Sequence, residues 1–169
     1  AAARAGTGGE GMTPCPPRQP ALSAEEKQFL LDLARQTLRS VVAGGAPTEP
    51  PVEKLSARLT EPKACFVTLN RGGELRGCIG HIFAKVPLYQ AVVENTRNAS
   101  TCDFRFDPVD PSELDEIDIE ISVLTQTHPL TFRSPDELLR QLRPEVDGVV
   151  LQVGGRLATF LPKVWSQIP

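Results

Sequence analysis

Residues 75–80 (Leu-Arg-Gly-Cys-Ile-Gly) bring together the residue types best suited to chemistry in this chain. Cys78 stands between Gly77 and Gly80, and glycines inside a strand often mark a bulge or the close approach of a ligand. An accessible thiol acts as a nucleophile or a redox group when a nearby cation favours its thiolate form, and Arg76 is two residues away. The segment therefore makes Cys78 a candidate catalytic residue, with Arg76, Gly77 and Gly80 as candidate ligand-binding residues. The alternative is that Cys78 is a small buried thiol that packs in the core.

A second unusual segment, residues 103–108 (Asp-Phe-Arg-Phe-Asp-Pro), places an arginine between two phenylalanines. The rigid guanidinium fork of Arg105 suits either the binding of an anionic group or a structural ion pair with Asp103 or Glu120. Arg105, Asp103 and Glu120 are therefore further candidate ligand-binding residues. Two simpler interpretations stay open: the arginine ties a loop to a sheet, and Glu120 is an exposed carboxylate.

Neither histidine completes a catalytic set with Cys78. On a regular strand His81, three residues later, points to the opposite face, and His128 precedes a proline in a predicted loop. The N-terminus lacks the apolar run of a signal peptide, which favours reduced thiols in a cytoplasmic protein. No metal site and no cofactor are predicted, because no CxxC pair occurs among the cysteines, Cys15, Cys65, Cys78 and Cys102.

A predicted hairpin positions the thiol. Residues 64–69 and 75–82 have strand character, and Gly72-Gly73 supplies a turn in which both positions tolerate a positive φ. A regular register from that turn pairs Asn70 with Leu75, and it also pairs Val67 with Cys78. One face then receives Cys65, Val67, Leu69, Arg76, Cys78 and Gly80. The other receives Phe66, Thr68, Leu75, Gly77, Ile79 and His81. In this arrangement Cys78 is either an accessible thiol beside Arg76 or a small core residue beside Val67.

Helices are expected on both sides of this hairpin in the chain. A Ser-x-x-Glu capping box at residues 23–26 begins one helix, and Gly44-Gly45 ends it. A second helix is predicted over residues 87–100, because proline is a favourable first helical residue. This helix carries Asn95 and Asn98, which line a pocket or simply face water.

Strict alternation of apolar and polar residues over 117–123 predicts a half-buried strand, with Glu120 on its polar side. Hairpins and helices follow one another without a βαβ pattern, so the sequence favours the α+β class, with a mainly antiparallel sheet flanked by helices. The remaining predicted elements are a helical turn around residues 54–59, a helix from residue 134, a hairpin over 148–160 and a helical turn at 162–167.

Composition excludes several classes of function. The 169 residues include seven Phe, one Trp and one Tyr and carry a net charge of −3, which argues against nucleic-acid binding. No stretch approaches 18 consecutive apolar residues, so no membrane partner is expected. Residues 103–120 hold eight acids and one base, which predicts a solvated acidic loop. Residues 1–20 hold eight glycines and prolines, which predicts a disordered leader or a cloning remnant before a domain over 21–169.

Five segments taken together resemble the AMMECR domain family, known in bacteria and archaea as protein A of the AmmeMemoRadiSam system. The resemblance runs in collinear order from about residue 22 to residue 169. It implies a compact α+β fold with a smaller lobe beside the sheet, in a cytoplasmic protein. Family members usually continue with a further C-terminal helix, so the domain is expected to be truncated at its C-terminus. The segments are residues 75–80, 103–108, 119–124, 147–149 and 159–165.

The resemblance names no reaction, but it implies a functional centre at Arg76-Gly77-Cys78-Ile79-Gly80. It also implies association with a Memo-like protein and a radical-SAM protein. Two hypotheses follow. In the first, the domain bears a pocket and acts through Cys78 together with these partners. In the second, it is a non-catalytic interaction module in which Cys78 is structural.

Overall fold

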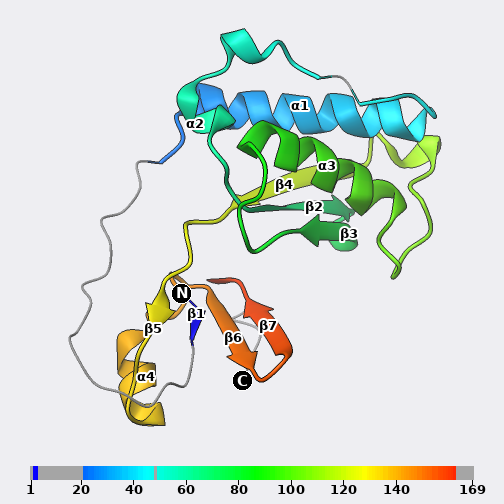
Figure 1. The fold of residues 1–169 in the computed structure, drawn as a ribbon. Helices are drawn as coiled ribbons and strands as arrows, with labels where there is room; N and C mark the ends of the chain where they lie inside the picture. Colours follow the sequence, from blue (N-terminus) through cyan, green and yellow to red (C-terminus); the bar gives the residue numbers. More distant parts are fainter. Residues whose placement is uncertain (1, 4–20, 48, 163–169) are drawn as a thin grey trace. The chain divides into compact units, whose positions relative to one another are not determined.

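The computed structural model describes residues 2–3, 21–47 and 49–162 of the chain (Figure 1). Helices combined with a mainly antiparallel arrangement of strands confirm the α+β class. Of the leader predicted over residues 1–20, only Ala2–Ala3 is described, as the short strand β1. The rest of that segment lies outside the described residues, as does most of the helical turn predicted at the C-terminus.

The chain divides into two compact units. The larger unit spans Gln19–Thr125, and the smaller unit combines Ala1–Arg18 with Gln126–Pro169. Every candidate site residue predicted from the sequence lies in the larger unit. The fold of that unit therefore decides which of these residues meet.

Helix α1 (Ala24–Val42) begins at the predicted capping box. The Glu26 amide donates a hydrogen bond to the Ser23 hydroxyl at 3.1 Å, and the Ser23 amide donates to the Glu26 carboxylate at 2.8 Å. These two bonds satisfy amides that the first helical turn leaves without partners. Gly44 follows the helix with a φ of 79°, a conformation that suits glycine.

Helix α3 (Leu88–Thr101) follows the hairpin, with Pro87 as its N-cap, and the helix predicted there is confirmed. Two short turns, η1 (Val52–Lys54) and α2 (Ala57–Thr60), replace the single helical turn that the sequence predicted between them. A third turn, η2 (Pro111–Glu113), interrupts the long acidic connection.

The sheet of the larger unit has three antiparallel strands in the order β3-β2-β4. They are β2 (Cys65–Arg71), β3 (Glu74–Gly80) and β4 (Ile117–Val123). Gly72 and Gly73 join the first two with φ values of 59° and 84°, as the predicted hairpin turn requires. Strand β3 is therefore an edge strand, and its outer backbone groups need partners from outside the sheet.

The register of the hairpin changes at a bulge. Asn70 faces Leu75, as predicted, but Leu69, the residue before Asn70 on β2, faces Gly77. Arg76 is therefore an extra residue on β3. A bulge of this kind disrupts the ladder locally and re-aims the side chains beyond it.

Beyond the bulge Val67 faces Ile79 and Thr68 faces Cys78. The predicted pairing of Val67 with Cys78 is therefore wrong, because it assumed an uninterrupted strand. The residues of β3 from Gly77 to Gly80 therefore lie on the opposite faces from those predicted, whereas the residues of β2 keep their predicted faces. We call one side the helix face; it carries Cys65, Val67, Leu69, Gly77, Ile79, Ile117, Ile119, Ile121 and Val123. We call the other the Cys78 face; it carries Phe66, Thr68, Asn70, Cys78, Gly80, Asp118, Glu120 and Ser122.

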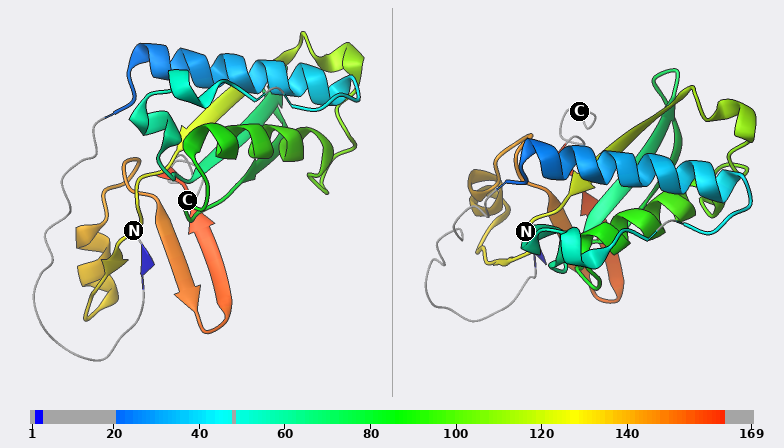
Figure 2. Two further views of the ribbon diagram at one scale, coloured as in Figure 1. Left: turned by 45° about the horizontal axis from the view of Figure 1, so that its top comes forward. Right: turned by 90° about the horizontal axis from the view of Figure 1, so that it is seen from above.

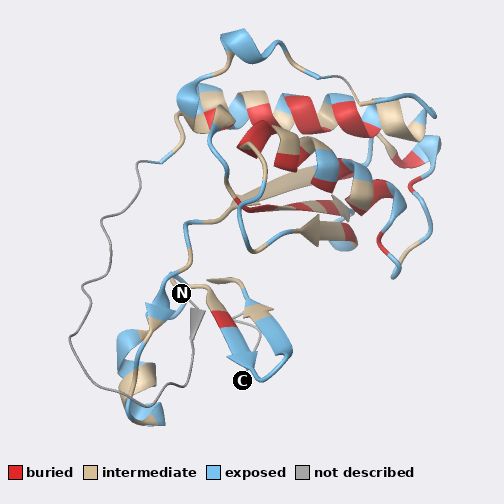
Figure 3. Cartoon of the chain, viewed as in Figure 1, coloured by how far each residue is buried: buried red, intermediate tan, exposed pale blue. Residues whose placement is uncertain are grey.

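Helices α1 and α3 pack against the helix face (Figure 2). The most deeply buried residues lie between these helices and the sheet (Figure 3). Val67, Leu69, Leu38 and Val92 are each 0% exposed. Burying aliphatic side chains of this size stabilises a fold by about 1.5–3 kcal/mol each.

The smaller unit contains a four-stranded sheet in the order β5-β1-β6-β7. Its predicted hairpin and helix are confirmed. Gly154 turns the hairpin with a φ of 57°, and Val150 is buried. The elements are β5 (Pro129–Leu130), α4 (Pro135–Gln141), β6 (Val149–Val153) and β7 (Arg156–Phe160).

None of the helices among the described residues is long and apolar enough to cross a membrane.

Candidate functional site

Two side chains from the 103–108 segment hold the backbone of Cys78 at the outer edge of β3. The Cys78 amide donates a hydrogen bond to the Asp103 carboxylate at 2.8 Å. The Arg105 guanidinium donates to the Cys78 carbonyl oxygen at 3.2 Å. An edge-strand residue normally leaves these groups to water or to another strand. Here a carboxylate and a guanidinium, 25 and 27 residues further along the chain, take that place.

Asp103 and Arg105 also bind each other. The guanidinium donates to both carboxylate oxygens, with Nε–Oδ1 at 2.9 Å and Nη2–Oδ2 at 2.7 Å. The Arg105 amide adds a third bond to the same carboxylate at 3.2 Å. The Asp103 side chain is 2% exposed and that of Arg105 is 43% exposed. The sequence prediction that Asp103 is a partner of Arg105 is thus confirmed.

This pairing shifts the titration of both groups. Hydrogen bonds from Arg105, and more weakly from the Cys78 amide, hold the pKa of the Asp103 carboxyl well below its usual range. The hydrogen bond to Asp103 raises the pKa of Arg105, and the charge of a Cys78 thiolate adds to that shift.

The Cys78 thiol lies on the Cys78 face, where it is partly exposed. The Thr68 hydroxyl, directly across on β2, donates a hydrogen bond to the sulfur at 3.4 Å. On the other side of Thr68, β4 places Glu120 in the same row. Strands lie about 4.8 Å apart, so Glu120 is roughly 10 Å from Cys78 across the sheet. Glu120 therefore lies in the same row as Cys78, but its Cα is too far from that of Cys78 for a direct contact.

The two glycines that flank Cys78 have separate structural reasons. A Cβ on Gly77 would collide with the Ala99 carbonyl oxygen on α3, so glycine allows the helix to approach the sheet. A Cβ on Gly80 would collide with the Phe66 ring, which lies across β3 at this point. Their ligand-binding role stays a prediction, but packing alone already requires both glycines.

Arg76, the bulged residue, binds a different part of the acidic connection. Its guanidinium makes a paired contact with the Glu113 carboxylate, with both N–O distances at 2.9 Å. It also donates to the carbonyl oxygens of Asp107 and Pro108 at 2.9 and 3.3 Å. The ligand-binding role of Arg76 stays a prediction, and in this structure its donors face the protein's own oxygens.

Glu113 is a neighbour of the candidate site that the sequence interpretation missed. It is 7% exposed and accepts bonds from Arg76, from Arg71 at 3.0 Å and from the Asp110 amide at 2.8 Å. These contacts, the one to Arg76 foremost, lower the pKa of the Glu113 carboxyl to about 2. A signal was present in the sequence: Asp110 with Glu113 has capping-box spacing inside a run of acids.

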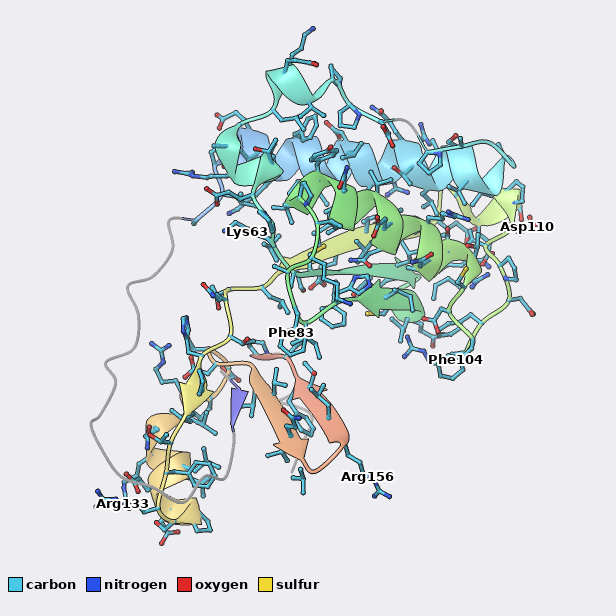
Figure 4. The ribbon with its side chains drawn as sticks, in the orientation of Figure 1. Lys63, Phe83, Phe104, Asp110, Arg133 and Arg156 are labelled. Carbon is cyan, nitrogen blue, oxygen red and sulfur yellow. The ribbon has the colours of Figure 1, made fainter. Side chains whose placement is uncertain are left out.

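The arginines also share an aromatic contact. The Phe106 ring lies 6.0 Å from the Arg76 guanidinium carbon and 5.5 Å from that of Arg105. Phe104, two residues earlier, is 96% exposed and projects at the tip of its loop (Figure 4). The predicted solvated acidic loop is therefore partly correct: several acids face water, but Asp103 and Glu113 are buried in ion pairs.

Cys65 lies in the opposite environment, on the helix face of the same strand pair. It is 0% exposed, and burial raises the pKa of its thiol to about 11, although a hydrogen bond from Asn95 acts in the other direction. Asn95 donates to the Cys65 carbonyl oxygen at 3.0 Å. Asn95 is therefore buried and ties α3 to β2, and the expectation that it simply faces water is wrong.

A protein-family model described as AMMECR1 matches residues 31–168. The chain belongs to the AMMECR1 family. The match contains the 75–80 and 103–108 segments, so the contacts around Cys78 lie within the region that the family defines. The resemblance inferred from five sequence segments is confirmed.

Archaeal proteins are among the relatives of this chain. A protein of Methanothermobacter thermautotrophicus is 38% identical over 146 residues, which cover 86% of this chain and 76% of that protein. Protein MK0488 of Methanopyrus kandleri is 38% identical over 157 residues, with 87% and 74% covered. The crystal structure of uncharacterized protein PH0010 from Pyrococcus horikoshii matches with a TM-score of 0.73 and 34% identity, and covers 80% of this chain and 68% of that one. None of these names states an activity.

Proposed function

We propose that this AMMECR1 domain binds a small ligand on the Cys78 face and uses the Cys78 thiol there as a nucleophile. One observation carries the proposal. Both backbone groups of Cys78 are held by the charged side chains of Asp103 and Arg105, while the residue as a whole stays partly exposed. Water would satisfy the same backbone groups at an edge strand. Fixing them instead with two ion-paired side chains sets the position of the thiol, as a site for chemistry needs.

Three side chains near the sulfur have proposed roles. The Thr68 hydroxyl donates a hydrogen bond to the sulfur and so helps to orient the thiol. The Arg105 side chain is 43% exposed, and its guanidinium is the proposed partner of an anionic group of the ligand. Glu120 lies in the same row of the sheet and is the proposed partner for a ligand group further from the sulfur.

The family resemblance supports protein partners for this site, a Memo-like protein and a radical-SAM protein. It also supports a cytoplasmic location and a domain that spans residues 21–169. In this proposal the partners supply or receive the group that Cys78 handles, and the domain presents the thiol. Arg76 keeps a predicted ligand role that requires its contact with Glu113 to open.

The experiment compares two thiols in the same fold. One variant, Cys15→Ser with Cys102→Ser, leaves Cys78 as the accessible thiol; the control, Cys15→Ser with Cys78→Ser, leaves Cys102, which is exposed. We expect iodoacetamide to label Cys78 several-fold faster than Cys102 at neutral pH, although Cys102 is more exposed. A Cys78 rate at or below that of Cys102 across pH 6–9 would reject the nucleophile.

One observation favours the second function, an interaction module. Phe104 is 96% exposed on a turn that the Asp103 carboxylate holds in place, and exposed aromatic residues often anchor protein interfaces. Binding of the purified Memo-like and radical-SAM proteins should then be lost in Phe104→Ala and retained in Cys78→Ser. If Cys78→Ser abolishes cellular function at unchanged stability, the purely structural role of the thiol is wrong.

A further inference from the structure

A small pocket lies at the end of the larger unit's sheet where β2 begins. It has a volume of about 80 Å³. Its walls come from the chain just before β2, the loop between β3 and α3, and the first two turns of α3. Figure 4 shows Lys63 and Phe83 at this end of the sheet. The lining residues are Lys63, His81, Phe83, Lys85, Val86, Ala91 and Glu94.

Backbone contacts hold the walls of this pocket together. The Lys63 amide donates to the Val86 carbonyl oxygen at 3.4 Å, and the Leu88 amide donates to that of Glu61 at 3.0 Å. Pro62 and Pro87 form an isolated bridge between the same segments. At the other end of the loop, the His81 amide donates to the Cys65 carbonyl oxygen at 3.1 Å. These contacts fix the backbone that carries the pocket walls, which lowers the entropic cost of binding.

The lining combines an apolar wall with a basic rim. Val86 and Ala91 supply aliphatic surface, and Phe83 leaves half of its surface exposed, at 50%. Three basic side chains, Lys63, His81 and Lys85, line the pocket against one acid, Glu94. Lys63 also contacts Glu61 at 3.9 Å. Lys85 is exposed and makes no ion pair with any residue that the structure describes.

We infer that this pocket binds a small organic anion, a carboxylate on a short branched apolar body. The basic rim selects the negative group, and Phe83, Val86 and Ala91 select the apolar body. The volume limits the ligand, because pockets for drug-sized molecules occupy about 300–1,000 Å³. Such a small ligand binds weakly, with a dissociation constant of roughly 1 mM.

This site is separate from the thiol of the proposed function. His81 pairs with Cys65 and so continues the helix face, and the other lining residues on α3 lie on that side as well. The Cys78 sulfur lies on the opposite face of the same strand. Loss of the thiol chemistry would leave this pocket intact, and the reverse also holds.

The test is a titration of the whole chain followed by amide NMR shifts. The probes are isovalerate, its neutral analogue isovaleramide, and inorganic phosphate, which carries charge without an apolar body. We expect isovalerate to shift the amides of residues 81–94 and to bind at least fivefold more tightly than either other probe. Lys85→Gln and Phe83→Ala should each weaken isovalerate binding at least threefold, and their own spectra report whether the fold is intact.

The control variant is Lys54→Gln, an exposed lysine on η1 outside the pocket lining, which should leave binding unchanged. Equal binding of isovaleramide would overturn the anionic preference. Equal binding of phosphate, insensitive to Phe83→Ala, would overturn the apolar body. Shifts spread over the surface, equally weakened by Lys54→Gln, would overturn the site itself.

Discussion

Cys65 and Cys78 lie on neighbouring strands of one small sheet, yet the two thiols have opposite surroundings. Cys65 is on the helix face, 0% exposed, with its pKa raised to about 11 chiefly by burial. Cys78 is on the other face, partly exposed beside a hydroxyl donor. Cys65 therefore serves as the reference for a packed thiol in this fold. Cys78 differs from it in being less buried and in accepting a hydrogen bond from a threonine hydroxyl.

The backbones differ as much as the sulfurs. The Cys65 carbonyl oxygen accepts hydrogen bonds from the His81 amide and from Asn95, both within the core arrangement of strands and helix. The backbone of Cys78 is held instead by Asp103 and Arg105 from a distant loop. We call the Asp103–Arg105 ion pair that binds the Cys78 backbone the clamp. A residue needed only for packing would not require such a clamp at the sheet edge, so the contrast supports a thiol that is held in position.

The largest expected effect is the difference in labelling between the two thiols. With Cys15 and Cys102 replaced by Ser in both proteins, we compare Cys65→Ser with Cys78→Ser. We expect the remaining Cys78 to react with iodoacetamide at least about 100-fold faster than the remaining Cys65, because Cys65 reacts only when the core opens. A ratio below tenfold would remove the distinction between the two environments.

Removing the clamp is expected to cost stability next. Asp103→Ala leaves the Cys78 amide and the Arg105 guanidinium without their carboxylate, and we expect a loss of about 2–3 kcal/mol in the free energy of unfolding. Urea denaturation measures it. Asp103→Asn is the matched control, since it keeps an acceptor without the charge and should lose less. If Asp103→Ala is as stable as the native chain, the clamp does not hold the edge.

A substitution at Gly77 tests the approach of α3 from the helix face. A Cβ there meets the backbone of Ala99, which is not a flexible group, so Gly77→Ala should destabilise the fold by roughly 2 kcal/mol. The matched control is Gly155→Ala in the hairpin of the smaller unit, where a Cβ meets open space. Equal stability of the two variants would contradict the close packing described here.

Acid should weaken the two carboxylates that tie the loop to β3. The pKa of Glu113 is lowered to about 2, and that of Asp103 is lowered as well, so the unfolded chain takes up protons before the folded one does. The free energy of unfolding should therefore fall as the pH drops from about 5 to about 2. The Glu113→Gln variant should show a shallower fall, measured by urea denaturation at each pH, and an identical slope would contradict the assignment.

The smallest expected effect concerns the hydroxyl beside the sulfur. Thr68→Val keeps the shape and removes the donor to Cys78, so we expect labelling of Cys78 to slow by about two- to threefold. Thr60→Val, on α2, is the control for a threonine away from the thiol. No change in the labelling rate would mean that the contact does not influence the sulfur.

Much of this arrangement follows from local sequence signals. The capping box at Ser23, the Gly72-Gly73 turn and the alternation along β4 each depend on neighbouring residues, and each is confirmed. The sequence proposed two ion-pair partners for Arg105, Asp103 and Glu120, and the structure shows the pair with Asp103. Features set by short-range chemistry can therefore be predicted from the residues that form them.

The parts that sequence reasoning missed depend on contacts across the chain. The glycines of the motif suggested a bulge or the close approach of a ligand, but they did not place a bulge at Arg76, whose guanidinium reaches Glu113, 37 residues away. The burial of Asn95 depends on the packing of α3 against Cys65. The clamp on Cys78 needs the 103–108 segment to return to the sheet edge, which the motif suggested without indicating the atoms involved.

The bulge at Arg76 decides which face of the sheet Cys78 occupies. Side chains alternate between the two faces of a strand, so a shift of the pairing by one residue moves each side chain to the other face. Because Arg76 stays out of the ladder, Cys78 faces Thr68 and not Val67. If Arg76 were paired in the ladder instead of bulging, Val67 would face Cys78, and the thiol would turn toward α3 while Ile79 turned away from it. Whether one residue bulges or pairs thus separates a partly exposed cysteine from a packed one, with no change in the chemistry of any side chain.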